Sequence, residues 1–234
     1  MVMENKKNRK YFYLYISFCV LIFHTSCGQS HTNKSETQNT FTSPRSNGAN
    51  IDTQYEYADS GGKPLIIQNS LPKGETYFDP NGKEYFKVIF WTRIINETDK
   101  PLELKIDFPA NSYAVSSLPG KYFKVLVPPD TMTIDKEPLH DYGMTGLKSF
   151  LDNNNNSKSS RLKRTIIPKE SGSFYVVILF DRGVGGPFRA GLTMKGQNLF
   201  YRISRYGGTP AHSFIDEKEI NCGSINLKSL MLQR

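Results

Sequence analysis

The sequence contains few of the side chains from which metal sites and nucleophilic active sites are built. Its 234 residues include three cysteines and four histidines, whereas a structural zinc site needs about four such ligands at close spacing. Neither His140 nor His212 stands in a hydrolase or metalloprotease motif. We therefore predict turn or surface positions for both histidines, and neither a metal, a cofactor nor an enzyme activity.

The sequence also has no long apolar run. The longest, from Tyr11 to Phe23, is interrupted by tyrosines and a serine, and it is shorter than the roughly 20 residues that a transmembrane helix needs. Four basic residues precede it, at positions 6, 7, 9 and 10. A basic start followed by a short apolar block is typical of a signal peptide.

The residues after this block, Thr25-Ser26-Cys27-Gly28, resemble the lipobox of bacterial lipoproteins of the Bacteroidota type, with His24 where leucine is usual. The resemblance implies that residues 1–26 are removed and that Cys27 becomes an N-terminus carrying acyl chains such as palmitate, held in a membrane. Gly28 stands where aspartate would retain such a protein at the inner membrane, which implies the outer membrane. Residues 29–33 lack the acidic cluster of surface-exported lipoproteins, which favours the periplasmic face. The alternatives are surface exposure, an ordinary secretory peptide cut nearby, and an uncleaved anchor.

Export would leave a single free cysteine. Cys19 leaves with the signal peptide and Cys27 carries the lipid, so Cys222 has no partner for an intramolecular disulfide. We predict that Cys222 is a buried, inert thiol near a strand end, the alternative being a reactive or intermolecular thiol.

The charge of the chain does not indicate a nucleic-acid partner. Residues 1–26 carry four basic side chains and one acidic one, so the mature chain keeps about five of the eight net positive charges. The remaining basic residues form no dense stripe of the kind that binds nucleic acid. Residues 27–62 are rich in Ser, Thr, Asn, Gln and Gly, which predicts a flexible tether ahead of a folded domain at 63–234. Within the tether, Ile51, Tyr55 and Tyr57 could mark a first short strand.

Beyond Lys63 the sequence changes to short runs with a period of two, separated by Gly, Pro, Asn and Asp, which predicts β-strands. The clearest are Tyr85–Asn96 and Leu102–Phe108, which we predict as two antiparallel strands on either side of the turn at 96–101. Ile89 and Trp91 make the second face of the first strand apolar, so this strand is expected to be central. Further strands are expected at 122–127, 161–167, 173–180, 187–195, 198–204, 219–222 and 224–230, with a hairpin turn at 195–198.

These strands predict an all-β fold, a single antiparallel β-sandwich. The turn at 96–101 and the strand start at 167–174 resemble those of immunoglobulin-like domains of bacterial exported proteins, although the Cys-Trp-Cys framework is missing. One short helix is expected at Asp141–Leu151, where apolar residues recur on one face.

A basic and aromatic surface is the candidate binding site. If the last strands pair as predicted, Arg189, Lys195 and Arg202 share an outward face beside Tyr175 and Phe200. Such a face could hold an anionic glycan, a lipid headgroup or a partner protein, the alternative being an ordinary solvated face. The predicted function is that of a non-enzymatic binding or scaffolding lipoprotein of the cell envelope. A secretion or surface-assembly accessory protein is one alternative, and an envelope hydrolase, based only on the histidine and carboxylate candidates, is another.

Overall fold

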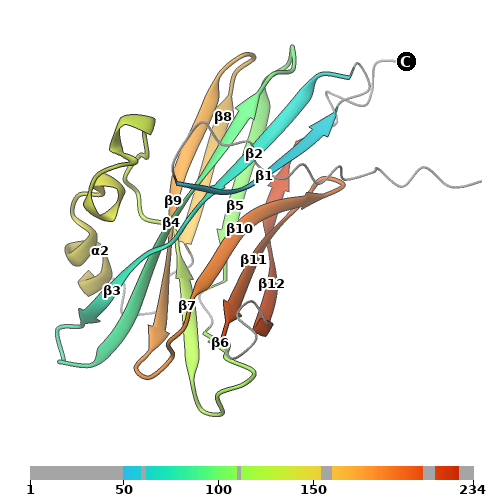
Figure 1. Ribbon diagram of the computed structural model, residues 1–234. Coiled ribbons are helices and arrows are strands. Elements are labelled where there is room, and N and C mark those ends of the chain that lie inside the picture. Colours follow the sequence, from blue (N-terminus) through green and yellow to red (C-terminus); the bar gives the residue numbers. More distant parts are fainter. Residues whose placement is uncertain (1–49, 59–61, 110–111, 154–159, 208–213, 227–234) are drawn as a thin grey trace, which may run out of the picture. The chain divides into compact units, whose positions relative to one another are not determined.

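The computed structural model describes residues 50–58, 62–109, 112–153, 160–207 and 214–226, all within one compact unit, Asn39–Arg234. The predicted signal peptide, Cys27 and His212 lie outside the described residues. Two antiparallel sheets pack face to face, and helical segments cover the outer side of one of them (Figure 1). The predicted all-β sandwich with one short α-helix is confirmed.

Sheet A contains seven strands in the order β1-β2-β4-β9-β7-β6, and β3 pairs with β4 beyond the end of β2. The central position predicted for β4 is confirmed, since β2 and β3 lie along one edge of it and β9 lies along the other. The strands are β1 Ile51–Ala58, β2 Pro64–Ser70, β3 Lys73–Phe78, β4 Glu84–Asn96, β6 Tyr113–Ala114, β7 Tyr122–Leu126 and β9 Ser171–Asp181.

Sheet B contains five strands in the order β10-β11-β12-β5-β8. The predicted hairpin between β10 and β11 is confirmed, with Lys195 opposite Asn198 across the turn. The strands are β5 Leu102–Phe108, β8 Ser160–Ile166, β10 Phe188–Lys195, β11 Asn198–Tyr206 and β12 Phe214–Ile225.

The main hydrophobic core lies between the two sheets. Successive side chains of a strand point to opposite faces, so Leu104 and Phe108 of β5 are buried while Lys105 is exposed. The rings of Phe180 in sheet A and Phe188 in sheet B stack with centroids 4.3 Å apart. Aromatic stacking therefore adds to apolar burial in joining the sheets.

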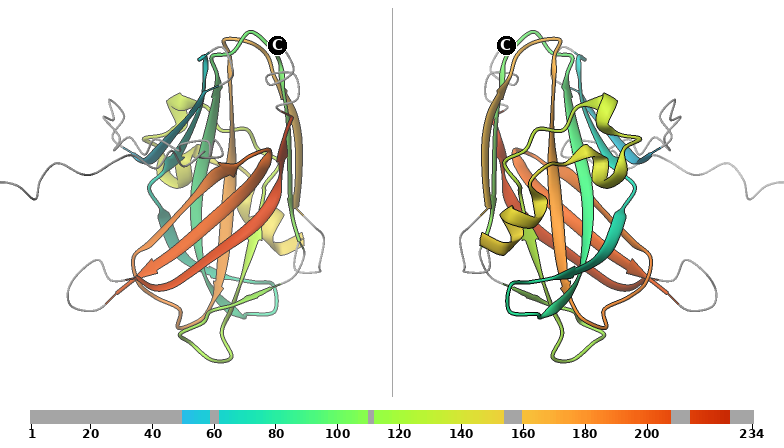
Figure 2. Two further views of the ribbon diagram at one scale, coloured as in Figure 1. Left: turned by 90° about the vertical axis from the view of Figure 1, so that its right-hand side faces the viewer. Right: turned by 90° about the vertical axis from the view of Figure 1, so that its left-hand side faces the viewer.

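A second core lies on the outer face of sheet A, because β4 and β9 are apolar on both sides. Ile89, Trp91 and Val177 are buried there. They lie beneath a helical layer that consists of η1 Ile134–Lys136, η2 His140–Gly143 and α2 Leu147–Asn153. The right-hand view of Figure 2 looks onto this layer, and the left-hand view looks onto sheet B.

The helix predicted over 141–151 is broken near its start. Asp141, Tyr142 and Gly143 have backbone φ values of 48°, 55° and 63°, a left-handed conformation that an α-helix of L-residues cannot continue. Two lysines of sheet A hold this segment. The Lys73 ammonium donates to the Leu139 carbonyl at 2.5 Å and lies 3.9 Å from the centroid of the Tyr142 ring. The Lys87 ammonium forms an ion pair with Asp141 at 2.9 Å. Tertiary contacts therefore offset the strain of the backbone.

Side chains of sheet A occupy the backbone edge of β10 in sheet B. The amide of Asn69, which is 1% exposed, accepts from Leu192 N at 2.8 Å, donates to Leu192 O at 3.1 Å and accepts from the Thr92 hydroxyl at 2.9 Å. The Tyr57 hydroxyl likewise accepts from Met194 N at 2.9 Å. The two sheets are thus hydrogen-bonded to each other at this edge as well as packed.

Three expectations about the strands, their bounds and their pairing are corrected by the structure. The strands β4 and β5 do not pair but lie in different sheets. The Asn96 amide holds the intervening turn: it donates to Lys100 O within the turn at 2.8 Å and to Ile166 O of β8 at 3.0 Å. The strands predicted at 219–222 and 224–230 are one strand, β12, bent at Gly223, with 227–230 outside the described residues. The tether predicted to extend to residue 62 contains β1, which pairs with β2 from Ile51 to Ala58.

Candidate functional site

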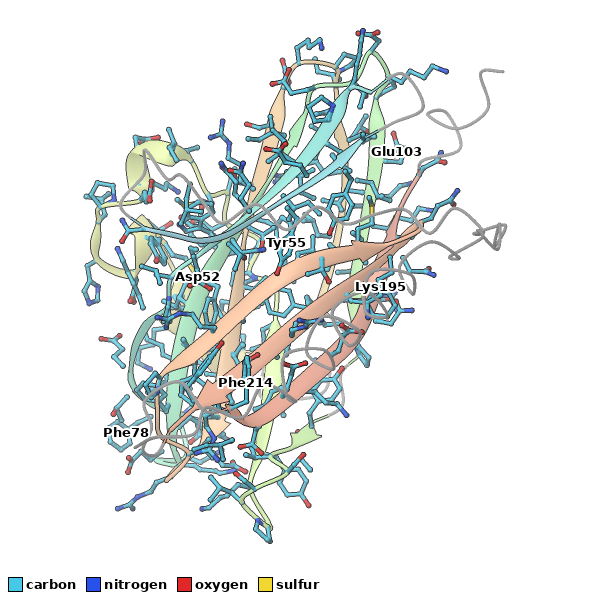
Figure 3. All side chains as sticks on the ribbon, turned by 45° about the vertical axis from the view of Figure 1, so that its right-hand side comes forward. Asp52, Tyr55, Phe78, Glu103, Lys195 and Phe214 are labelled. Atoms are coloured by element: carbon cyan, nitrogen blue, oxygen red, sulfur yellow. The ribbon has the colours of Figure 1, made fainter. Side chains whose placement is uncertain are left out.

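The predicted basic face lies on the outer side of sheet B, where the strand register places Arg189, Lys195 and Arg202 on one face. Each of these cations meets a carboxylate, however. Arg189 lies 2.9 Å from Asp52 of β1, and Lys195 lies 2.6 Å from Glu219 of β12. Arg202 lies 3.3 Å from Glu219 and 3.7 Å from Glu217 of the same strand, so three carboxylates face the three cations. Figure 3 shows Asp52 beside β10 and Lys195 near the β10–β11 turn. Because the positive charge is paired on the face itself, this surface offers little attraction for an anionic ligand.

The two aromatic residues predicted for this face lie apart from each other. Phe200 is on it, with the Lys195 ammonium 4.9 Å from its ring centroid. Tyr175 is in β9 of sheet A, completely buried under the helical layer, and its hydroxyl donates to Tyr142 O at 2.7 Å. Burial raises the pKa of Tyr175 to about 12. The prediction that Tyr175 shares the basic face is therefore wrong. Both faces of β9 are apolar, so the sequence does not show which layer covers the face that carries Tyr175.

His140 lies at the surface of the helical layer, with 82% of its side chain exposed. Its ring nitrogens are 3.8 Å from Glu75 and 3.8 Å from Asp141. The same two carboxylates contact the buried ammonium of Lys87, at 2.5 Å and 2.9 Å. These charges thus fasten the helical layer to sheet A. His212 lies outside the described residues.

Cys222 is buried in β12, and its thiol lies 3.5 Å from Leu199 O. Burial raises the pKa of this thiol to about 12, so the reactive thiolate forms only near that pH. We expect iodoacetamide to leave Cys222 unmodified in the folded protein at pH 8 and to alkylate it in guanidinium chloride. Mass spectrometry of the peptide containing Cys222 measures the alkylated fraction under both conditions. Rapid alkylation of folded protein would contradict an inert thiol.

A larger concave surface lies instead on the outer face of sheet A, beyond the helical layer. It is a groove of about 400 Å³, which is within the range of about 300–1,000 Å³ typical of small-molecule sites. Strands β4, β9 and β7 form it together with the loops before β4 and β6. Its lining residues are Lys83, Tyr85, Ser112, Tyr122, Phe123, Lys124, Leu179 and Asp181; below we call it the sheet A groove.

Strand alternation determines what the sheet A groove presents. Tyr85 pairs with Asp181, and Leu179 pairs with Lys124, so these side chains lie on one face of three adjacent strands. The Tyr85 ring stacks at 6.2 Å from that of Tyr77. At the open end Tyr122 is 48% exposed. The groove therefore combines aromatic surface with polar groups.

The charges of the groove do not balance. Asp181 is the one carboxylate in its lining, and it is engaged by Lys83 at 3.2 Å and by the Tyr122 N–H at 2.9 Å. Lys83 also lies 4.6 Å from the centroid of the Tyr85 ring. Lys124 has no acidic partner within 4 Å among the residues that the structure describes. The Lys124 ammonium is therefore available to bind an acidic group of a ligand.

Little in the sequence indicates this groove. Its residues come from strands separated by up to about 100 positions, and Tyr85 and Lys124 belong to no spaced motif. The one indication in the sequence was that β4 and β9 are apolar on both faces. This implied a layer over sheet A but not where that layer ends.

Comparisons with known proteins assign no family. No protein-family model matches the chain, and no curated protein matches it. Across residues 50–226, leaving out the undescribed gaps, no three His, Cys, Asp or Glu side chains are grouped so as to hold a metal ion. None of the helices described is both long and apolar enough to cross a membrane.

Proposed function

We propose that this chain is a bacterial envelope lipoprotein, anchored by acyl chains on Cys27, whose β-sandwich binds an envelope component without catalysing a reaction. The observation that carries the binding role is the sheet A groove, where Tyr85, Tyr122 and Lys124 stand together at the end of the sheet that the helical layer leaves open. Convergent polar and aromatic groups in one concave surface are typical of a ligand site.

The anchoring part of the proposal rests on the sequence alone. It is supported by the basic and apolar segments before Cys27 and by the small residues Thr25 and Ser26. The sandwich begins at about residue 50, so about 20 residues separate it from the lipid. A polar chain of that length has a root-mean-square reach of roughly 25 Å. The sandwich would then be close to the membrane but clear of the lipid headgroups.

Metabolic labelling tests the anchor. In the native host, a clickable palmitate analogue is expected to label the wild-type protein and to leave Cys27→Ala unlabelled, because the thiol of Cys27 is the acceptor in this proposal. Fluorescence of the protein band after azide coupling is the readout, and Cys222→Ala serves as the matched control that should stay labelled. An unlabelled wild type, or equal labelling of Cys27→Ala, would overturn the lipoprotein assignment.

Isolation of partners tests the binding role separately. The wild-type protein, purified from detergent-solubilised envelopes, is expected to retain a glycan or another envelope component that a Tyr122→Ala variant retains less well. Enrichment of secretion-machinery proteins by both forms alike would favour an accessory role in secretion or surface assembly instead.

A further inference from the structure

We propose that the sheet A groove binds a saccharide that carries a carboxylate, as in a chain of uronic acids, with Lys124 as the group that recognises the charge. The inference rests on the proposed binding function and narrows it to one ligand chemistry. It uses the placement of Lys124, Tyr85 and Tyr122 around one groove.

The aromatic rings indicate a sugar. The carbon-bound hydrogens on one face of a pyranose ring pack against the π-face of a tyrosine, and the hydroxyl groups around its rim need polar partners. Tyr122, which is 48% exposed, offers such a ring, Tyr85 adds its ring edge beside it, and Ser112 and Asp181 add donor and acceptor groups.

The charges indicate that the sugar is acidic. The single carboxylate of the lining, Asp181, is already paired with Lys83, and Lys124 is left without an acidic partner among the described residues. A lysine next to an aromatic-lined groove can donate to a carboxylate, and a charge-assisted hydrogen bond is about twice as strong as a neutral one. The basic face of sheet B has no such surplus, because its three cations are paired.

A smaller concavity among the described residues does not suit this ligand. It lies between the sheets, lined by Val115, Phe123 and Phe188, and holds about 20 Å³, which is little more than the space of one water molecule. Its mouth is crossed by the ion pair of Arg205 and Asp216 at 2.6 Å. A sugar ring could enter it only by opening the sandwich.

Isothermal titration of the full-length protein in detergent, with two trisaccharides of equal length, tests the inference. Trigalacturonate, which carries three carboxylates, is expected to bind at least about 10-fold more tightly than neutral maltotriose. Lys124→Ala is expected to remove that difference, Lys124→Arg to restore most of it, and added salt to reduce it. Lys105→Ala is the matched control, because Lys105 is an exposed lysine of β5 in sheet B that also has no ion-pair partner among the described residues. Its affinity for trigalacturonate should equal that of the wild type.

Three outcomes would overturn the inference. The first is equal binding of the two trisaccharides, or of neither. The second is an equal effect of Lys124→Ala and Lys105→Ala. The third is binding to phosphatidylglycerol vesicles that depends on Lys124 while trigalacturonate fails to bind, which would assign the groove to a lipid headgroup. Palmitate labelling is independent of all three, so failure of the ligand class and failure of the anchor remain distinguishable.

Discussion

Gly223→Ala is expected to lower the free energy of unfolding by about 4 kcal/mol or more. Gly223 has a φ of 142°, and a Cβ atom at this position would lie 2.0 Å from the backbone oxygen of Lys105. The backbone of β5 is held on its other edge by β8 along its whole length, from Leu102 to Phe108, whereas β12 pairs with β5 over only three residues, beginning with Gly223 opposite Ile106. That short ladder joins β10, β11 and β12 to β5 and β8. Added bulk there would split sheet B.

Guanidinium chloride unfolding followed by tryptophan fluorescence measures the effect, since Trp91 is the single tryptophan and is buried. Gly185→Ala is the matched control, because its φ is not in the left-handed region and no atom lies within 4 Å of the added Cβ. It should change the free energy of unfolding by less than about 0.5 kcal/mol. A Gly223→Ala protein as stable as Gly185→Ala would contradict the described pairing of β12 with β5.

Asn69→Ala should destabilise the protein by about 3 kcal/mol. The substitution leaves the N–H and C=O groups of Leu192 without partners at a buried edge, and it also removes the acceptor of the Thr92 hydroxyl. A buried polar group without a partner costs about 1–3 kcal/mol. Asn69→Asp should lower the free energy of unfolding at least as much, because the carboxylate of aspartate cannot donate to Leu192 O and its negative charge would repel that oxygen.

The Asn69→Asp variant separates hydrogen bonding from packing, because aspartate has nearly the same volume as asparagine. Gln68→Ala on the same strand is the control, since the Gln68 side chain donates to the partly exposed Gln54 at 2.8 Å; it should change stability by less than about 0.5 kcal/mol. Wild-type stability of Asn69→Asp would show that the amide fills space but does not join the sheets.

Much of the fold could be predicted because local pattern and burial agree. The alternation of Leu104, Ile106 and Phe108 with charged residues correctly predicted one buried face of β5, and the apolar residues on both sides of β4 correctly predicted a central strand. Pairing was less predictable, because adjacency in sequence favours a hairpin. The turn at Asn96 instead crosses between sheets, held by side-chain hydrogen bonds that periodicity does not reveal.

β1 and the groove were missed for related reasons. Residues 27–62 are polar overall, so composition favoured a tether over the short strand that Ile51, Tyr55 and Tyr57 could mark. Pairing with β2 and the ion pair between Asp52 and Arg189 fix residues 51–58 as a strand. The groove depends on which strands become neighbours and on where the helical layer stops. The alternation of β10 and β11 did place three cations on one face. It could not show that Glu217 and Glu219, on a third strand, would neutralise two of them.

The hydrogen bonds from Asn69 and Tyr57 to β10 also bear on self-association. A free strand edge is a template on which a second copy can add its own strand. On one side of sheet B the N–H groups of Leu192 and Met194 are already occupied by side chains of the same molecule. On the other side β8 carries exposed Arg161 and Lys163, and charged side chains on an edge oppose stacking of copies. The sheet is thereby guarded against edge-to-edge aggregation at both of its margins.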